Sequence, residues 1–226
     1  MTKKLIIFGL SNIAECAFEY FTHDSDYDVV AFTLDKAYLE SEGQVHFGLP
    51  VVAFEDLETC FPPEEFDIFV AVGSKNLNRL RKTKVKQAKE KGYSLASYIS
   101  SKATIWPNVK LGQHVFIQEG NNLQPFVEIG DNVTLWAGNH VGHASVIEDH
   151  CFITSQVVIS GHCRIGKNCF VGVNACLADN ISVGKDSFIG MGAIITQDTE
   201  ENSLFAASKT HVSKIPAKRF CRVKDD

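Results

Sequence analysis

The sequence predicts an α/β domain of the Rossmann type followed by a parallel β-helix. In the second half of the chain, from about residue 105 to about residue 197, an aliphatic residue recurs at every sixth position. Neither an α-helix nor a single strand has a period of six, and a fixed internal repeat is typical of coiled architectures. The first hundred residues lack this period and alternate apolar runs with amphipathic stretches, which is typical of β-α-β units.

The aliphatic series is unbroken. Its members are Ile105, Leu111, Ile117, Leu123, Ile129, Leu135, Val141, Ile147, Ile153, Ile159, Ile165, Val171, Leu177, Val183, Ile189 and Ile195. We predict that these side chains point into the coil and stack as its core. Most of them follow, by two positions, a small or β-branched residue. Cys151, Cys163 and Cys169 occupy that small position and are expected to be buried as small apolar groups.

Turn residues show a second period, of 18 residues. Similar corners occur at residues 112–114, 130–132, 148–150, 166–168 and 184–186. Three hexapeptides therefore make one coil with three short strands and three turns, and residues 18 apart stack on one another. This pattern predicts a regular three-sided prism.

The first 98 residues are predicted to form a small Rossmann-like domain, and residues 99–226 the β-helix domain with a C-terminal tail. Predicted strands cover residues 5–8, 29–34, 51–54, 68–72 and 94–99, and predicted helices cover residues 12–21 and 76–92. Because strands alternate with helices, the sheet is expected to be parallel.

The turn after the first predicted strand, residues 9–14, stands where dinucleotide-binding folds carry three glycines. Gly9 keeps the first glycine, whereas Ser11 and Ala14 replace the others, so the NAD signal is weak. A helix N-terminus behind a strand still favours a phosphate, and Asp35 ends the second strand where such folds recognise a nucleoside. The alternative is that Ser11 caps the helix and Asp35 begins a turn.

Composition argues against several classes of protein. The formal net charge of −5 gives no general electrostatic attraction to nucleic acid. No apolar run approaches the roughly 18 residues that a membrane span needs, so we expect no membrane span and a cytoplasmic protein. The seven cysteines include no Cys-x-x-Cys pair, and neither disulfides nor a cysteine metal site is expected.

Of the eight histidines, His143 is the best placed for general-base chemistry. An imidazole titrates near neutral pH and accepts a proton from an amine or a hydroxyl. Gly161, one coil further along the same predicted corner, would let a thioester approach the backbone and would offer its N–H to a developing oxyanion. The alternative is a turn histidine beside an ordinary turn glycine.

The other histidines are assigned to structure. His114 and His150 lie in the corner series and are predicted to be turn residues, and His162, which follows Gly161, is assigned to a different corner from theirs. No zinc site is expected, because the histidines occupy different columns of the coil.

Two segments carry a resemblance to a known family. Residues 142–147 (GHASVI) and 165–174 (IGKNCFVGVN) resemble segments of the nucleotide-aminosugar N-acetyltransferases, which are hexapeptide-repeat acyltransferases. The group includes bacillosamine-pathway and perosamine acetyltransferases and sialic-acid O-acetyltransferases, and the resemblance covers nearly the whole chain. It implies a left-handed parallel β-helix, a homotrimer with active sites between subunits, acetyl-CoA as the donor, and a nucleotide-linked amino sugar held by the N-terminal domain.

The resemblance also implies roles for single residues. His143 falls on the catalytic histidine and Gly161 on the glycine whose backbone contacts the thioester. Other acyl-CoA contacts fall on Phe152, Val173 and Met191. Nucleotide-sugar contacts fall on the first turn and the end of the second strand, at Gly9, Ser11, Asn12, Ile13, Asp35, Lys36 and Ala37.

The chain departs from the family pattern at three places. Ala144 stands where the family often has an acidic residue that raises the basicity of the histidine. Phe152 stands where a family histidine lies in the CoA groove. Residues 206–218 lengthen the usual Gly-x-Pro-Ala-Lys ending.

The sequence therefore predicts an acetyl-CoA-dependent N-acetyltransferase without a metal. Its acceptor is the amino group of a nucleotide-linked amino-deoxy sugar, in bacterial surface-glycan biosynthesis of the O-antigen, capsule or lipopolysaccharide type. Two alternatives stay open: O-acetylation of a sugar hydroxyl by the same residues, and a non-catalytic trimeric scaffold that binds a nucleotide sugar. A hydroxyl needs a base more than an amine does, so Ala144 favours the amine.

Overall fold

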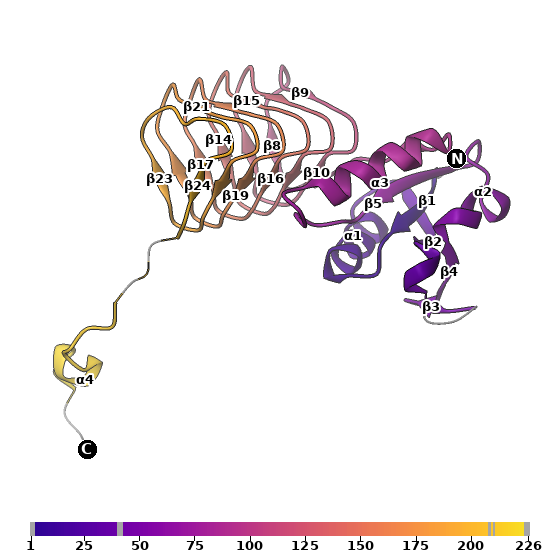
Figure 1. The fold of residues 1–226 in the computed structure, drawn as a ribbon, viewed down its shortest axis with the longest axis horizontal. Coiled ribbons are helices and arrows are strands. Elements are labelled where there is room, and N and C mark those ends of the chain that lie inside the picture. The colour runs from indigo at the N-terminus through magenta and orange to yellow at the C-terminus, as the bar shows by residue number, and fades with distance from the viewer. Residues whose placement is uncertain (1–2, 40–42, 208, 210, 224–226) are drawn as a thin grey trace.

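The chain forms an α/β domain and a coil of stacked strands, with a C-terminal segment that projects from the far end of the coil (Figure 1). The computed structural model describes residues 3–39, 43–207, 209 and 211–223. None of the helices in these ranges is long and apolar enough to cross a membrane.

The α/β domain is built on a six-stranded sheet in the order β3-β4-β2-β1-β5-β6. Its strands are β1 (Lys3–Phe8), β2 (Tyr27–Leu34), β3 (Val45–His46), β4 (Leu49–Ala53), β5 (Phe66–Val70) and β6 (Ser94–Leu95). Neighbouring strands are parallel except for the β3–β4 pair. The predicted parallel sheet is therefore confirmed.

Helices cover both faces of this sheet. On one face α1 (Asn12–His23) packs Ala14, Ala17 and Phe21 against alternate residues of β1. On the other face α3 (Arg79–Glu90) packs Val85 and Ala88 against the intervening ones. The shorter helical elements are η1 (Lys36–Tyr38), η2 (Phe54–Asp56), α2 (Leu57–Cys60) and, near the C-terminus, α4 (Ala217–Phe220).

The coil has three flat faces of parallel strands. The seven-stranded face comprises β7 (Tyr98–Ile99), β10 (Phe116–Ile117), β13 (Thr134–Leu135), β16 (Phe152–Ile153), β19 (Phe170–Val171), β22 (Phe188–Ile189) and β24 (Leu204–Phe205). The six-stranded face comprises β8 (Thr104–Ile105), β11 (Asn122–Leu123), β14 (His140–Val141), β17 (Val158–Ile159), β20 (Cys176–Leu177) and β23 (Ile194–Ile195). The five-stranded face comprises β9 (Lys110–Leu111), β12 (Glu128–Ile129), β15 (Val146–Ile147), β18 (Arg164–Ile165) and β21 (Ser182–Val183).

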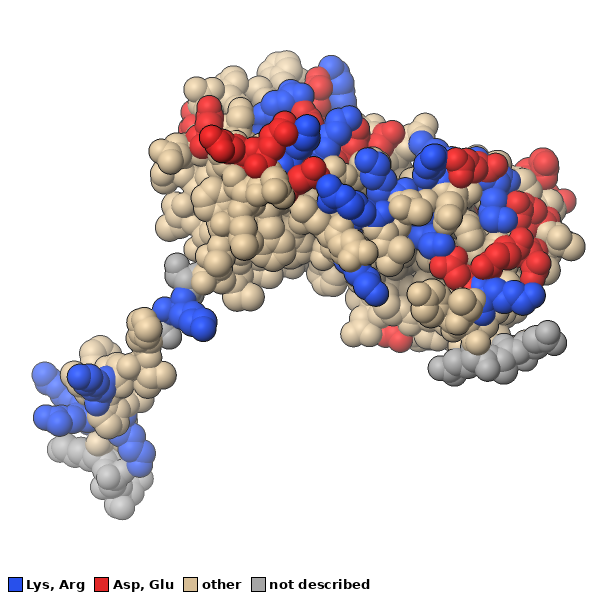
Figure 2. Space-filling model, in the orientation of Figure 1, with Lys and Arg blue, Asp and Glu red and all other residues tan. Residues whose placement is uncertain are grey.

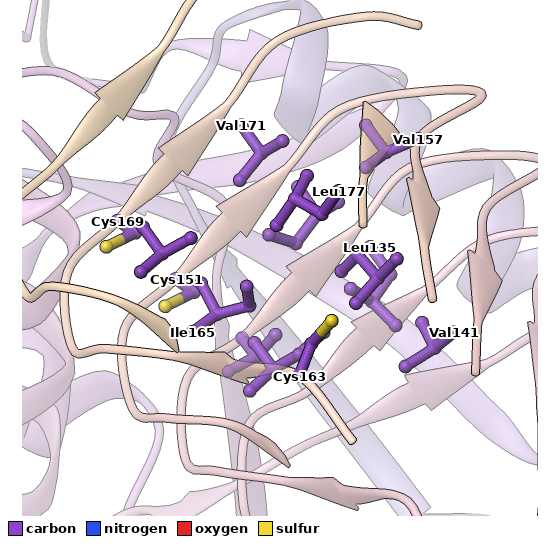
Figure 3. Close-up of a cluster of buried hydrophobic side chains, with 14 of the residues drawn as sticks. Leu135, Val141, Cys151, Val157, Cys163, Ile165, Cys169, Val171 and Leu177 are labelled. Atoms are coloured by element: carbon purple, nitrogen blue, oxygen red, sulfur yellow. The ribbon is translucent and has the colours of Figure 1, made fainter. Parts of the chain in front are cut away.

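The register confirms the predicted period. Residues 18 apart pair on every face, as Phe116 does with Thr134 and His140 with Val158. The last coil is shorter, because Phe188 pairs with Leu204. The predicted aliphatic series fills the interior, and Cys151, Cys163 and Cys169 are buried among it as predicted (Figure 3).

Three corners join the faces, and we name two of them. The docking corner, between the five- and seven-stranded faces, consists of turns 112–115, 130–133, 148–151, 166–169 and 184–187. The histidine corner, between the six- and five-stranded faces, consists of turns 106–109, 124–127, 142–145, 160–163 and 178–181. The third corner joins the seven- and six-stranded faces.

Two predicted elements were wrong in their bounds. The strand expected over residues 94–99 is two strands in different sheets, because the Ala96 N–H donates to Ile68 of the first sheet and the Tyr98 N–H to Val115 of the coil. The helix expected from residue 76 begins at Arg79, because residues 76–78 have φ values of 54°, 49° and 65° and form a left-handed turn. The coil also runs past the expected end at residue 197, to β24.

Arg81 of α3 fixes the α/β domain to the docking corner. Its side chain is buried, and its Nε and Nη2 donate to Asn132 Oδ1 and to the carbonyl oxygens of Asn132, His150 and Cys151, at 3.0–3.3 Å. Burial lowers the pKa of Arg81 to about 10, so the guanidinium stays charged at neutral pH. Its charge is therefore stabilised by oriented carbonyl dipoles.

His114 reinforces the same contact. Its Nε2 accepts the Val70 backbone N–H at 2.9 Å, and its Nδ1 lies 3.0 Å from Asn132 Oδ1. Burial, with the Arg81 charge beside it, lowers the pKa of His114 to about 3. His114 and His150 are turn residues with φ values of 56° and 66°, as predicted, and His114 in addition joins the coil to β5.

We expect the substitution Arg81→Ala to lower the free energy of unfolding by about 3 kcal/mol, because it leaves several buried carbonyl groups without a donor. Urea denaturation at pH 7 measures the change. The control is Lys86→Ala on the same helix, whose exposed side chain pairs only with Glu90, and it should cost less than about 0.5 kcal/mol. A cost below about 1 kcal/mol for Arg81→Ala would contradict the assignment.

Acid is expected to destabilise the fold through His114. The unfolded chain binds this proton below about pH 6.5, whereas the native imidazole stays neutral until about pH 3, so stability falls as the pH drops through this window. The loss from His114 alone is about 3 kcal/mol by pH 4. Urea denaturation at pH 7 and pH 4 should show a smaller difference in His114→Gln than in the wild type. An unchanged difference would refute the role of His114; His23→Gln, at an exposed position, is the control.

Candidate active site

His143 lies at an exposed turn of the histidine corner, between β14 and β15. Its backbone N–H donates to Gln124 Oε1 at 2.9 Å, and its ring Nδ1 lies 3.3 Å from the same oxygen. Gln124 comes from the preceding coil. The imidazole is therefore held from one side by an amide, and no neighbouring acidic side chain is needed to orient it.

The ring of His143 rests on Gly161 of the next coil. A Cβ added at residue 161 would lie 2.5 Å from His143 Cε1 and 2.9 Å from both ring nitrogens, so a side chain there would displace the ring. Among the hydrogen bonds of the described residues, none uses the Gly161 N–H. The structure thus places the histidine beside a buried glycine whose N–H has no hydrogen-bond partner among the described residues, and the closeness of the two residues is what the 18-residue period predicts.

His162 also lies at this corner, which is a different corner from that of His114 and His150, as predicted. Its ring lies 4.9 Å from that of His143 in an edge-to-face arrangement, and its backbone N–H donates to the His143 carbonyl at 2.8 Å. The physical reason is stacking, because residue 162 lies 18 beyond Ala144 and shares its φ of 55°.

The residues expected to contact acyl-CoA do not converge within one chain. Val173 and Met191 lie exposed on the third corner, where the Gly192 N–H donates to the Val173 carbonyl, so they stack as predicted. Phe152 lies on the seven-stranded face and is only 5% exposed, beneath the guanidinium of Arg81 at 5.3 Å from its ring centre. Three parts of the coil surface therefore carry these residues and His143.

The predicted nucleotide loop is the turn between β1 and α1. Gly9 has a φ of 116°, and its N–H donates to Thr33 of the neighbouring strand. The Ser11 side chain makes no capping hydrogen bond to α1, and Ser11 and Asn12 are exposed, with Ile13 half-buried beside them. The side chains at this helix N-terminus are therefore open to a ligand, which is where a phosphate is best received.

A second loop, which sequence reasoning missed, faces the first. It follows β5, and a Cβ at Gly9 would lie 3.0 Å from the Ala71 carbonyl, while a Cβ at Gly73 would meet the Ile13 side chain at 2.8 Å. The strand order reverses between β1 and β5, and ligands of open α/β sheets bind at such a switch point. A glycine directly behind a buried strand was the signal that could have identified the second loop.

Asp35 lies at the end of β2 and is paired with Lys84 of α3 at 2.6 Å. The two line a cavity of about 510 Å³ together with Phe54, Glu55, Gln87, Glu90 and Lys91. Lys36 and Ala37 follow in η1, where the Lys36 N–H donates to Glu55 Oε2. The strand end predicted to recognise a nucleoside therefore borders a cavity large enough for a planar ring, and its carboxylate already has an internal cationic partner.

Within the described ranges, no three His, Cys, Asp or Glu residues lie close enough together to hold a metal ion. The candidate site comprises His143, the backbone N–H of Gly161 and the exposed turn before α1.

Two family models match the repeats of the coil. The family described as "Bacterial transferase hexapeptide (six repeats)" matches residues 126–161, and the family described as "Hexapeptide repeat of succinyl-transferase" matches residues 163–197. A sequence search of curated proteins finds no match.

Solved structures resemble nearly the whole chain. The acetyltransferase domain of PglB from Neisseria gonorrhoeae FA1090 is 27% identical, with a TM-score of 0.80, over 91% of this chain and 97% of that one. The same domain has been solved in complex with acetyl coenzyme A. The chain thus shares its repeat and its overall fold with hexapeptide-repeat sugar acetyltransferases. PerB from Caulobacter crescentus, solved with CoA and GDP-perosamine, shares the fold at 24% identity, with a TM-score of 0.78 over 90% of this chain and 94% of that one.

These comparisons confirm the fold class predicted from the hexapeptide period and the acyltransferase class that the resemblance implies. Gln124 and His162 are the neighbours of His143 that the sequence analysis missed. Both lie 19 residues from it, one coil away and one position over, so counting neighbours at 17 and 19 residues as well as at 18 could have found them.

Proposed function

We propose that this acetyltransferase moves the acetyl group of acetyl-CoA to the amino group of a nucleotide-linked amino-deoxy sugar, in the cytoplasmic synthesis of a bacterial surface glycan of the O-antigen, capsule or lipopolysaccharide type. The observation that carries the proposal is the exposed imidazole of His143 resting on Gly161, whose N–H has no partner among the described residues. The likeness to a PglB acetyltransferase domain solved with acetyl coenzyme A supports the donor.

In the proposed reaction His143 is the general base. The sugar amine attacks the thioester carbonyl carbon, and Nε2 of His143 takes the proton that the nitrogen loses. The Gly161 N–H donates to the oxyanion of the tetrahedral intermediate. The C–S bond then breaks, and the proton held by His143 passes to the departing CoA thiolate.

Transfer is direct in this proposal. The thiols of Cys151 and Cys163 are buried in the coil core, and burial raises the pKa of both, so neither is a ready nucleophile. The partner of the His143 ring is a neutral amide, Gln124, and not a carboxylate. A hydroxyl needs a base more than an amine does, so the lack of a carboxylate partner favours an amine acceptor.

We further propose a homotrimer whose active sites lie between subunits. The α/β domain contacts the docking corner through Arg81, Asn78 and His114, and it reaches the first turns of the third corner through Tyr20 and Asp24. None of its hydrogen bonds among the described residues reaches the histidine corner. A complete site then needs the nucleotide loop or the third corner of another copy. The α/β domain and His143 lie at different corners of one coil, and this separation supports a site that is shared between subunits.

The surface of the coil supports the same arrangement. Charged side chains gather along one edge of the coil, and the rest of its visible surface is nearly free of them (Figure 2). The ion pairs of that edge join Lys110 to Glu128 and Lys167 to Asp149. Val158, Met191 and Ile194 are exposed on the six-stranded face and the third corner, where a second copy would bury them.

We expect His143→Ala to lower kcat by about a hundredfold or more while CoA binding is retained, because the base is lost but the donor groove is not. Release of free thiol from acetyl-CoA, in the presence of a panel of UDP-, dTDP- and GDP-linked amino sugars, measures the rate. Unchanged turnover would exclude His143 as the base, and no turnover by the wild type with any of these sugars would favour a non-catalytic scaffold. Treatment of the product with mild alkali separates the amide from an ester, since only the ester is cleaved.

Mixed oligomers test the shared site. His143→Ala and Asn12→Trp, a bulky change in the nucleotide loop, should each be inactive alone. If a site combines the histidine of one subunit with the loop of its neighbour, each mixed trimer regains one of its three sites, and an equal mixture recovers about a quarter of wild-type activity. Activity that stays at the level of the separate variants would place the whole site within one chain.

A further inference from the structure

Gln124 is the side chain that the structure sets against the candidate base. It lies in turn 124–127 of the preceding coil, is half-buried, and reaches across the gap between the two coils to His143. Its own backbone is fixed by the coil, since its N–H donates to Val141 at 3.0 Å. The side chain therefore starts from a rigid position.

The orientation of the Gln124 amide follows from an obligate donor. The His143 backbone N–H lies 2.9 Å from the Gln124 terminal atom, and a backbone N–H always donates. An amide nitrogen cannot accept such a bond, so the atom that faces His143 is the oxygen, Oε1. The assignment rests on hydrogen-bond chemistry and does not depend on telling nitrogen from oxygen by position.

The protonation of the imidazole follows in turn. The same Oε1 lies 3.3 Å from His143 Nδ1, and an amide oxygen only accepts. The contact is favourable only when Nδ1 carries the hydrogen. In the neutral ring the lone pair is then on Nε2, the nitrogen on the other side of the ring from Gln124.

We propose that Gln124 is a positioning residue of this acetyltransferase, which holds His143 in the Nδ1–H tautomer and so leaves Nε2 as the base. The inference rests on the proposed function. It assigns to a residue one coil away the orienting task that Ala144, the neighbour in sequence, has no polar side chain to perform. Gly161 completes the arrangement, because the absence of a side chain there lets the ring lie where Gln124 can reach it.

The other groups around the ring are few. His162 contacts it edge-on at 4.9 Å, and Asp179 stands two coils along in the same column. An amide partner fixes the tautomer without adding a negative charge beside the ring. His143 consequently releases its proton to the thiolate more readily than it would next to a carboxylate.

The first test reads the ring directly and needs no substrate. Nitrogen-15 NMR of the full-length protein should show the Nδ1–H tautomer at His143 in the wild type and its loss in Gln124→Ala. Gln124→Glu, which keeps the acceptor and adds a charge, should retain the tautomer and move the titration midpoint of His143 up by about one pH unit. Gln113→Ala, an exposed glutamine on the docking corner, should leave the His143 signals unchanged.

The second test is kinetic. Gln124→Ala should lower kcat about tenfold with the KM for acetyl-CoA unchanged, and Gln124→Glu should recover activity with the acid limb of its pH profile moved to higher pH. An Nε2–H tautomer in the wild type, or a Gln124→Ala variant with an unaltered ring spectrum, would overturn the proposal. Because the spectrum is read without substrate, it decides the role of Gln124 even if the wild type transfers no acetyl group. The absence of acetyl transfer would contradict only the proposed function.

Discussion

The guanidinium of Arg81 links the two halves of this acetyltransferase, and the position of the nucleotide loop relative to the coil depends on it. It enters the docking corner, where turn residues with positive φ place their carbonyl oxygens toward α3. No carboxylate is needed, because several oriented carbonyl groups together offset the cost of removing the charge from water. The left-handed turn at residues 76–78 serves the same contact, since Asn78 Nδ2 donates to the carbonyl oxygens of Asn168 and Cys169.

This docking has a consequence for where catalysis can occur. A three-sided coil has three corners. Buried hydrogen bonds of Arg81 and Asn78 hold the α/β domain at the docking corner, and Tyr20 and Asp24 bond to the first turns of the third corner. His143 lies at another, and Val173 and Met191 lie at the third. Parts that one chain holds apart are brought together when copies pack side by side, because a second copy presents a different corner to the first. The rigidity of the docking contact is therefore compatible with a site that no single chain completes.

Much of the fold could be predicted from the sequence. The period of six arises because every sixth side chain points into the coil, and the period of 18 arises because the turns of successive coils stack. The pairing of His143 with Gly161 follows from that arithmetic. The contacts of Arg81 could not be predicted, because a basic residue in an amphipathic helix normally faces water, and only the tertiary fold reveals carbonyl acceptors around it. The contacts of Gln124 and His162 with His143 were not predicted, because neighbours across a corner are offset by one residue as well as by one coil.

Two histidines of the coil show how the same chemistry yields different roles. At His114 the Val70 N–H occupies Nε2, so the hydrogen lies on Nδ1 and is donated to Asn132. At His143 the Gln124 oxygen likewise favours the hydrogen on Nδ1, but Nε2 has no partner among the described residues. Both rings are fixed by groups whose donor or acceptor character cannot change. The His114 ring is buried and both of its nitrogens have hydrogen-bond partners, so it stabilises the domain contact. The His143 ring keeps a free lone pair at an exposed corner, and a general base requires such a lone pair.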